Sequence, residues 1–168
     1  MMEFTAALLN PQKVASIPVV FSKESAVLVI PKIGVAAQII FPTSTNLAVL
    51  EKAVDRGPTH YPDSALPGEN GNVFIFGHST GRPVVKNPAF TVFTNLHKLA
   101  IGDEIIVRSF RIKYIYRVSS VEVVNPDETK VYLASAKPKL TLSTCWPVGS
   151  PTNRTVVEAE FLGKSLID

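Results

Sequence analysis

The sequence predicts an all-β domain, a largely antiparallel eight-stranded β-barrel with two short helices. Three observations lead to this prediction. Short runs of β-branched apolar residues recur along the chain, thirteen prolines and nine glycines punctuate it, and helical patterns are few and short. Strands do not alternate with helices in the manner of an α/β protein. Because 168 residues can bury one full core, and because closure protects the edges of a sheet, we expect a single closed barrel.

The predicted strands are runs of β-branched and aromatic residues, several with alternating polar and apolar positions. In the longest run, Ile112, Tyr114 and Tyr116 share one face with Val118. The strands are expected at residues 26–31, 35–41, 72–77, 104–108, 111–124 and 139–144, with a last strand that begins near residue 153.

Two short helices are expected between these strands. Asn46 is a suitable N-cap for a helix over residues 46–54, in which leucine and valine recur with helical spacing. Within residues 88–100, phenylalanine and leucine recur every three residues, which predicts one or two helical turns. Residues 1–25 lack the barrel pattern, so we divide the chain into a leader, 1–25, and a domain, 26–168.

Composition excludes several classes of protein. The net charge of +3, from 17 basic and 14 acidic residues, is too small and too dispersed to indicate a nucleic-acid-binding protein. The basic residues between 108 and 117 are interpreted as the exposed face of a strand pair. The cysteine and the three histidines lack the spacing of a zinc site, and Asp55, Asp63 and Glu69 do not form a calcium loop. We therefore assign no metal and no other cofactor.

The only cysteine of the chain, Cys145, falls at the end of the predicted strand 139–144. Arg154 begins the next strand, so two adjacent strands would bring a thiol and a guanidinium together. A nearby cation favours ionisation of a thiol and makes it a nucleophile. The alternative is a buried, inert cysteine. The presence of Arg154, and of a suitable histidine elsewhere, favours the nucleophile.

That histidine is His78, which follows the apolar strand 72–77. Histidine titrates in the range that proton transfer requires. We expect Gly77 to let the chain bend so that His78 faces a cleft. His60 lies in a proline-flanked turn and is interpreted as a structural residue. We find no asparagine or aspartate clearly placed to orient His78, in contrast to the papain-like cysteine proteases.

These features resemble the signature of the sortases, the cysteine transpeptidases that attach proteins to the surface of Gram-positive bacteria. The matching residues are Thr-Leu-Ser-Thr-Cys at 141–145, the arginine at 154 and Gly-His at 77–78. Two upstream runs, 57–62 and 66–72, resemble sortases of the class D and class E type. The resemblance extends over about residues 27–162 and implies the sortase β-barrel.

The resemblance also implies a reaction. Cys145 would attack a peptide bond, His78 would protonate the departing amine, and Arg154 would stabilise the oxyanion. A C-terminal sorting signal would be cleaved after its threonine, and the acyl group would pass through a thioacyl-enzyme to an amine. The signal would be of the Leu-Pro-x-Thr-Gly, Leu-Ala-x-Thr-Gly or Leu-Pro-x-Thr-Ala kind. The partners implied are surface proteins that carry such a signal, and an amine acceptor on a cell-wall peptide or a pilin subunit.

An extended apolar peptide would fit a groove beside Cys145, with walls formed by the strand before it and by the loop near Val131. Thr144 would orient Arg154 or the substrate, and the backbone N–H of Trp146 would be a second oxyanion donor. The expected substrate-binding residues are Val131, Leu133, Leu142, Thr144 and Trp146.

Sortases normally carry an N-terminal membrane anchor. No stretch of this chain reaches the roughly 18–20 apolar residues that would span a bilayer, so we expect it to begin just after such an anchor. The location implied is the extracytoplasmic face of the cell membrane. Two other functions remain open: a cysteine hydrolase on the same fold, and a catalytically inactive surface β-barrel. Retention of Cys145, His78 and Arg154 argues against the inactive barrel.

Overall fold

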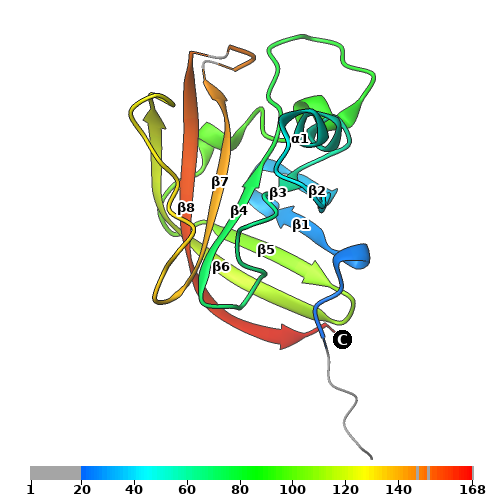
Figure 1. Cartoon of the computed structure of the whole chain (residues 1–168), viewed down its shortest axis with the longest axis vertical. Coiled ribbons are helices and arrows are strands. Elements are labelled where there is room, and N and C mark those ends of the chain that lie inside the picture. The colour runs from blue at the N-terminus through cyan, green and yellow to red at the C-terminus, as the bar shows by residue number, and fades with distance from the viewer. Residues whose placement is uncertain (1–19, 147, 151, 168) are drawn as a thin grey trace, which may run out of the picture.

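The computed structural model of the chain describes residues 20–146, 148–150 and 152–167 (Figure 1). The strands form one sheet with the order β2-β1-β5-β6-β8-β7-β4-β3. Neighbouring strands are antiparallel except for the parallel pair β4 and β7. The bounds are β1 Val27–Ile30, β2 Val35–Gln38, β3 Thr59–His60, β4 Gly71–Phe76, β5 Glu104–Ser109, β6 Ile112–Val124, β7 Pro138–Trp146 and β8 Asn153–Leu166.

The two edge strands, β2 and β3, are joined just beyond the end of β2. Ile40 forms a parallel bridge with Thr59. The backbone N–H of Ile40 donates to the carbonyl of Pro58 at 2.8 Å, and the carbonyl of Ile40 accepts from the N–H of His60 at 2.9 Å. The sheet therefore curls until hydrogen bonds connect its edges, which protects them from pairing with another chain. The predicted eight-stranded, largely antiparallel barrel fold is confirmed.

Helical segments lie in both regions where helices were expected. The helix α1 (Leu47–Val54) begins after Asn46, whose side chain accepts from the N–H of Ala48 at 3.0 Å. The second region forms two one-turn 3₁₀ helices, η3 (Pro88–Thr91) and η4 (Leu96–Lys98). Two further 3₁₀ turns are η1 (Lys23–Ser25) and η2 (Pro31–Ile33). Across the described residues, the helices are all too short or too polar to cross a membrane.

The core lies on one side of the sheet and is built from alternate residues of the strands. Leu28, Ile75 and Tyr116 are completely buried there, and the apolar residues that share one face of β6 are buried as well. Burial of a large apolar side chain of this kind stabilises the fold by about 1.5–3 kcal/mol. The intervening residues point to the opposite side of the sheet, which we call the outer face.

Residues 1–19, most of the expected leader, lie outside the described residues. The described end of that leader packs against the barrel. The ring of Phe21 contacts those of Phe41 and Tyr114, with centroids 5.9 Å apart in each case. The N–H of Ser22 donates to the hydroxyl of Ser109 at 2.7 Å, and that hydroxyl donates back to the carbonyl of Ser22 at 2.9 Å.

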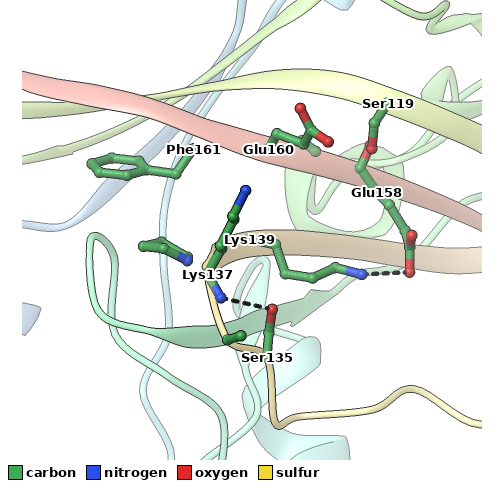
Figure 2. Close-up of a pocket in the computed structure, with 10 residues that line it drawn as sticks. Ser119, Ser135, Lys137, Lys139, Glu158, Glu160 and Phe161 are labelled. Atoms are coloured by element: carbon green, nitrogen blue, oxygen red, sulfur yellow. Dashed lines mark hydrogen bonds and ion pairs between the residues drawn. The ribbon is translucent and has the colours of Figure 1, made fainter.

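A cavity of about 590 Å³ lies beside the start of β7 (Figure 2). Charged side chains line it, and Lys139 Nζ donates to Glu158 Oε1 at 2.9 Å across β7 and β8. Lys139 precedes Cys145 on the same strand, and the rise of a strand separates the two by about 20 Å. The cavity is therefore remote from the predicted nucleophile.

Candidate active site

The strand register pairs the thiol with the guanidinium. Cys145 of β7 lies directly opposite Arg154 of β8. Side chains of directly opposite residues point to the same face, with their Cβ atoms about 4.5–5.5 Å apart. Cys145 is a free, partly exposed cysteine. The guanidinium of Arg154 is half-buried, and its Nη1 donates to the carbonyl of Asn153 at 3.0 Å.

Hydrogen bonds beyond the end of β4 bring His78 alongside Cys145. The parallel register of β4 and β7 ends with Phe76 opposite Ser143. The N–H of Gly77 then donates to the carbonyl of Ser143 at 3.1 Å, and the hydroxyl of Thr144 donates to the carbonyl of Gly77 at 2.7 Å. The hydroxyl of Ser79 donates to the carbonyl of Cys145 at 3.1 Å. The chain therefore follows β7 on both sides of His78.

The alternation of the strands directs the three side chains to the outer face. On β4, Val73 and Ile75 are buried in the core, and a Cβ at Gly77 would also point inward. His78, one residue later, points outward. On β7 the core-facing residues end with Thr144, so Cys145 points outward too, as does its partner Arg154. The structure thus brings together the three residues that the sequence predicted to be catalytic.

The expected role of Gly77 needs correction. Its backbone has no left-handed conformation, and the chain does not bend there to expose His78. A Cβ at this position would lie 2.7 Å from a ring carbon of Phe93 and 2.9 Å from a methyl group of Val92. Glycine is required because the side chains of Val92 and Phe93 pack directly against the backbone at this point.

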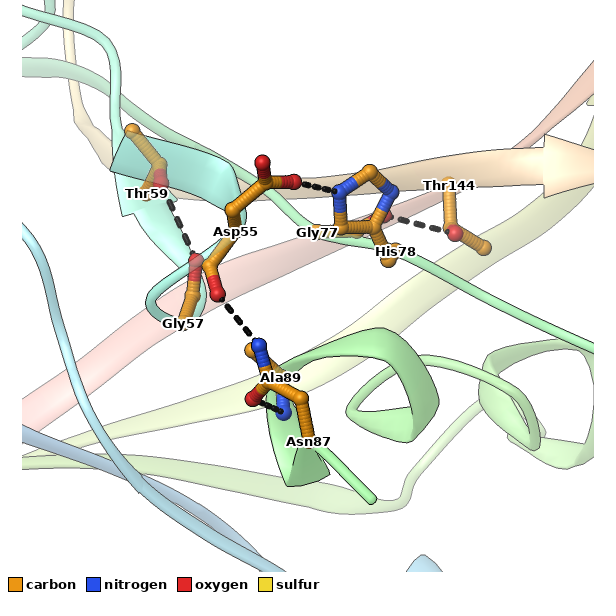
Figure 3. Close-up of polar contacts among 8 residues, drawn as sticks. All are labelled: Asp55, Gly57, Thr59, Gly77, His78, Asn87, Ala89 and Thr144. Carbon is orange, nitrogen blue, oxygen red and sulfur yellow. Dashed lines mark hydrogen bonds and ion pairs between the residues drawn. The ribbon is translucent and has the colours of Figure 1, made fainter. Parts of the chain in front are cut away.

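The expectation that no acidic residue orients His78 is also wrong. Nε2 of His78 lies 2.9 Å from Oδ1 of Asp55, the residue that ends α1 (Figure 3). The ring of Phe90 stacks on the imidazole, with centroids 4.8 Å apart and planes 22° apart. The carbonyl of His78 accepts from the N–H of Phe93 at 3.0 Å. No spacing in the sequence indicates the Asp55 contact, because it depends on how α1 packs beside the sheet.

Two of the expected substrate-binding residues lie on the wrong face. Leu142 is completely buried in the core, and Thr144 is 5% exposed. The hydroxyl of Thr144 donates to the carbonyl of Gly77, on the face of β7 opposite to Cys145 and Arg154. Alternation along β7 explains the error, because Cys145 is an odd number of residues away from each of them.

The other three expected substrate-binding residues are Val131, Leu133 and Trp146. Val131 and Leu133 are half-buried, and the carbonyl of Leu133 accepts from the N–H of Asn72 at 2.9 Å. Asn72 is near the start of β4, about 20 Å along the strand from His78. This loop therefore lies near the far end of the outer face. The side chain of Trp146 lies outside the described residues.

Aromatic residues that were not predicted as contacts line the outer face next to His78. Phe74 and Phe76 are half-exposed on β4, with ring centroids 5.8 Å apart. Tyr61 continues the row, 6.0 Å from Phe74. The signal is present in the sequence, since residues 74, 76 and 78 alternate with buried ones. We call Tyr61, Phe74 and Phe76 the aromatic row.

His60 is buried, in agreement with its interpretation as a structural residue. Its Nε2 lies 2.8 Å from the carbonyl of Ala65 and 3.0 Å from the hydroxyl of Ser64, and its ring packs on Phe41. Burial lowers the pKa of His60 below the ordinary value of 6.5. Among the residues that the structure describes, no group of three or more histidine, cysteine or acidic side chains could hold a metal ion.

The fold is a curled eight-stranded sheet, and one of its faces carries a cysteine, a histidine and an arginine. This combination is typical of β-barrel proteins with a nucleophilic cysteine. Comparison with known proteins identifies the class. Residues 28–162 match the model of the sortase domain, so the chain belongs to the sortase family, whose known members are transpeptidases that act at the cell surface. The resemblance stated from the sequence is confirmed.

Individual relatives agree with this assignment. The chain is 28% identical to Sortase D of Bacillus subtilis over 137 residues, which are 79% of this chain and 61% of that protein. It is 28% identical to Sortase A of Bacillus anthracis over 124 residues, 71% of this chain and 56% of that protein. The chain thus spans less than two thirds of the length of either. The structure of a Clostridium perfringens Sortase D5 transpeptidase superimposes with a TM-score of 0.64 at 32% identity, covering 82% of this chain and 78% of the other.

Proposed function

We propose that the domain formed by residues 26–168 is a sortase-type cysteine transpeptidase. It cleaves a C-terminal sorting signal of the Leu-Pro-x-Thr-Gly kind after threonine, and passes the acyl group to an amine of a cell-wall peptide or a pilin subunit. The observation that carries the proposal is the direct pairing of Cys145 with Arg154, with His78 held alongside by hydrogen bonds to β7. It acts at the extracytoplasmic face of the cell membrane, where its surface-protein substrates emerge.

In the first half of the reaction, the Cys145 thiolate attacks the threonyl carbonyl carbon. A C–S bond forms, and the carbonyl electrons move to oxygen. Arg154, which cannot lose its charge in proteins, donates to this oxyanion. The tetrahedral intermediate then collapses: the C–N bond breaks, and the leaving amine takes a proton from protonated His78. The products are a thioester on Cys145 and the released C-terminal peptide.

In the second half, an acceptor amine attacks the thioester carbonyl. Neutral His78 takes the proton of the attacking amine, an amide bond forms, and the thiolate of Cys145 leaves. Each residue returns to its starting state, so no external oxidant, reductant or metal is required. If water attacks in place of the amine, the same steps give hydrolysis, and the difference between the two reactions is the acceptor alone.

Substrate contacts are proposed along the aromatic row rather than at Leu142 and Thr144. Tyr61, Phe74 and Phe76 present apolar surface next to His78, and the loop with Val131 and Leu133 lies further along β4. An extended peptide advances about 3.3 Å per residue, so a sorting motif upstream of its threonine would cover the aromatic row before it reached that loop.

The test is to incubate the protein with three otherwise identical peptides, one per motif variant, together with an amine acceptor. Mass spectrometry of the products reports the cleavage position and the fate of the acyl group. Amide products formed after threonine support the proposal, and free acids alone would indicate the hydrolase. Recovery of all three peptides intact, with a Cys145 that a small thiol reagent labels, would count against both reactions.

A further inference from the structure

We propose that Asp55 is a positioning residue for the reaction. Its carboxylate accepts the Nε2–H of His78, which leaves Nδ1 as the nitrogen that exchanges protons beside Cys145. The inference rests on the proposed function and adds a fourth member to its site. It is carried by the 2.9 Å contact between Asp55 Oδ1 and His78 Nε2, and by the way in which each partner is held (Figure 3).

Hydrogen bonds to the backbone of Asp55 hold this residue in place, independently of its side-chain contact with His78. It ends α1, and its N–H donates to carbonyls within the last turn of that helix. Its own carbonyl accepts from Nδ2 of Asn87 at 2.8 Å, while Oδ1 of Asn87 accepts from the N–H of Ala89 at 3.0 Å (Figure 3). One asparagine side chain thus connects the end of α1 to the start of η3.

The imidazole is held from several directions. Phe90 of η3 stacks on its face and Asp55 engages one edge, while the backbone N–H of Phe93 donates to the backbone carbonyl of His78. Because Asn87 ties α1 to η3, the same contact fixes the positions of Asp55 and Phe90 relative to each other. These restraints leave the ring little freedom to turn, which is the condition for efficient proton transfer.

The contact selects a protonation pattern. A carboxylate can only accept, so Asp55 requires a proton on Nε2, and the exchangeable proton of the doubly protonated ring is then the one on Nδ1. Figure 3 shows Nδ1 directed away from Asp55, on the side of Thr144. When the leaving amine takes the Nδ1 proton, the Nε2–H remains donated to Asp55, and the ring becomes the neutral tautomer that accepts a proton at Nδ1 from the incoming amine.

Asp55 differs in charge from the other ionisable groups near His78. Cys145 and Arg154 face it from β7 and β8, and Arg82 and Lys86 line a cavity with Phe90. Of the groups named here, Asp55 carries the one carboxylate, and a carboxylate oxygen can accept the Nε2–H of His78. The carboxylate side chain is 56% exposed, so solvent weakens the effect, and we expect a moderate contribution.

The first experiment measures the tautomer without any substrate. Ring ¹⁵N signals of His78 distinguish protonated from unprotonated nitrogens in the neutral state. We expect the proton on Nε2 in the unmodified chain, loss of this preference in Asp55→Ala, and its retention in Asp55→Glu. The matched control is Glu51→Gln, which removes an exposed carboxylate one turn earlier on α1. Identical His78 signals in the unmodified chain and Asp55→Ala would overturn the proposal, whether or not the protein proves to be a transpeptidase.

The second experiment uses the peptide substrate. We expect Asp55→Ala, which removes the accepting oxygen, to lower kcat by about 10-fold or more, part of the 10²–10⁴-fold that a positioned acid contributes, with KM changed much less. Asp55→Glu should restore part of kcat, and Glu51→Gln should behave like the unmodified enzyme. An unchanged kcat in Asp55→Ala would show that the contact does not serve the reaction.

Discussion

Cys145, Arg154 and His60 differ in how much each contributes to the stability of the fold. Cys145 is partly exposed at the end of its strand and contributes little to the core. Arg154 lies opposite it and offers a planar set of donors that no other cation provides. His60, in contrast, is buried with both its ring and its hydrogen bonds committed to the structure.

Replacement of the thiol separates chemistry from packing. We expect Cys145→Ala to abolish turnover of a sorting peptide while the melting temperature changes by no more than a few degrees, because little buried surface is lost. Peptide cleavage and thermal melts on the same preparation check this. A variant that still cleaves would remove Cys145 from the reaction, and a large drop in melting temperature would identify a structural cysteine.

Arg154→Lys tests the geometry of the cation. The substitution keeps the charge and removes the planar fork. We expect kcat to fall by about 10²-fold or more, the scale for losing an oxyanion donor. Arg117→Lys, which makes the same exchange at an exposed position of β6, serves as the control and should have no effect on kcat. A near-normal rate in Arg154→Lys would mean that Arg154 acts only through its charge.

The buried imidazole of His60 predicts a pH dependence of stability. Its pKa is lower in the fold than the value of 6.5 in the unfolded chain, so below about pH 6.5 the unfolded chain binds a proton that the fold resists. The free energy of unfolding should therefore fall as the pH decreases through this range, and be fully restored above it. Urea melts between pH 5 and pH 7.5 measure this slope. His60→Gln should flatten it and His97→Gln should not, whereas an equal slope in both variants would assign the effect elsewhere.

Among the secondary-structure elements, the parallel pair β4 and β7 determines where the site forms. The pair carries His78 to the level of Cys145, and α1 and η3 close on the histidine from the other side. Just beyond this pair, the backbone at Gly77 lies against the side chains of Val92 and Phe93, which follow η3.

Gly77→Ala tests this packing. The new Cβ would lie within 3.0 Å of Phe93 and Val92, so we expect the free energy of unfolding to fall by about 1–3 kcal/mol, together with reduced turnover as His78 shifts. Gly81→Ala is the matched control, because its Cβ would meet its nearest neighbour at 3.7 Å. Urea denaturation of both variants gives the comparison. An equal free energy of unfolding for the two variants would contradict this, because it would mean that Phe93 and Val92 can move away from the new Cβ without destabilising the fold.

The sequence predicted most elements because period-2 alternation and turn residues are local signals. Strand β6 and helix α1 lie within one residue of their predicted bounds. The contact between Asp55 and His78 was not predictable, since it joins residues 23 positions apart through tertiary packing. The misassigned substrate contacts arose differently. The alternation along β7 places Leu142 and Thr144 on one face of the strand and Cys145 on the other. The same reasoning applied to β4 would have placed Phe74 and Phe76 on the face of His78.

On the scale of the whole molecule, strand order brings together parts of the chain that lie far apart in sequence. β4, β7 and β8 are neighbours in the sheet, while β5 and β6 lie between β4 and β7 in the chain. The bridge between Ile40 and Thr59 joins the sheet's edges beside the segment that carries Asp55. The site is therefore a property of the closed sheet and not of any single hairpin.

The most direct measurement is the mass of the intact protein after incubation with each sorting peptide in the absence of an acceptor. The account predicts an added mass equal to the peptide up to its threonine, mapped to Cys145, released by a small amine, and absent in Cys145→Ala. The contradictory result is an unmodified Cys145 with all three peptides, under conditions in which iodoacetamide alkylates the same thiol.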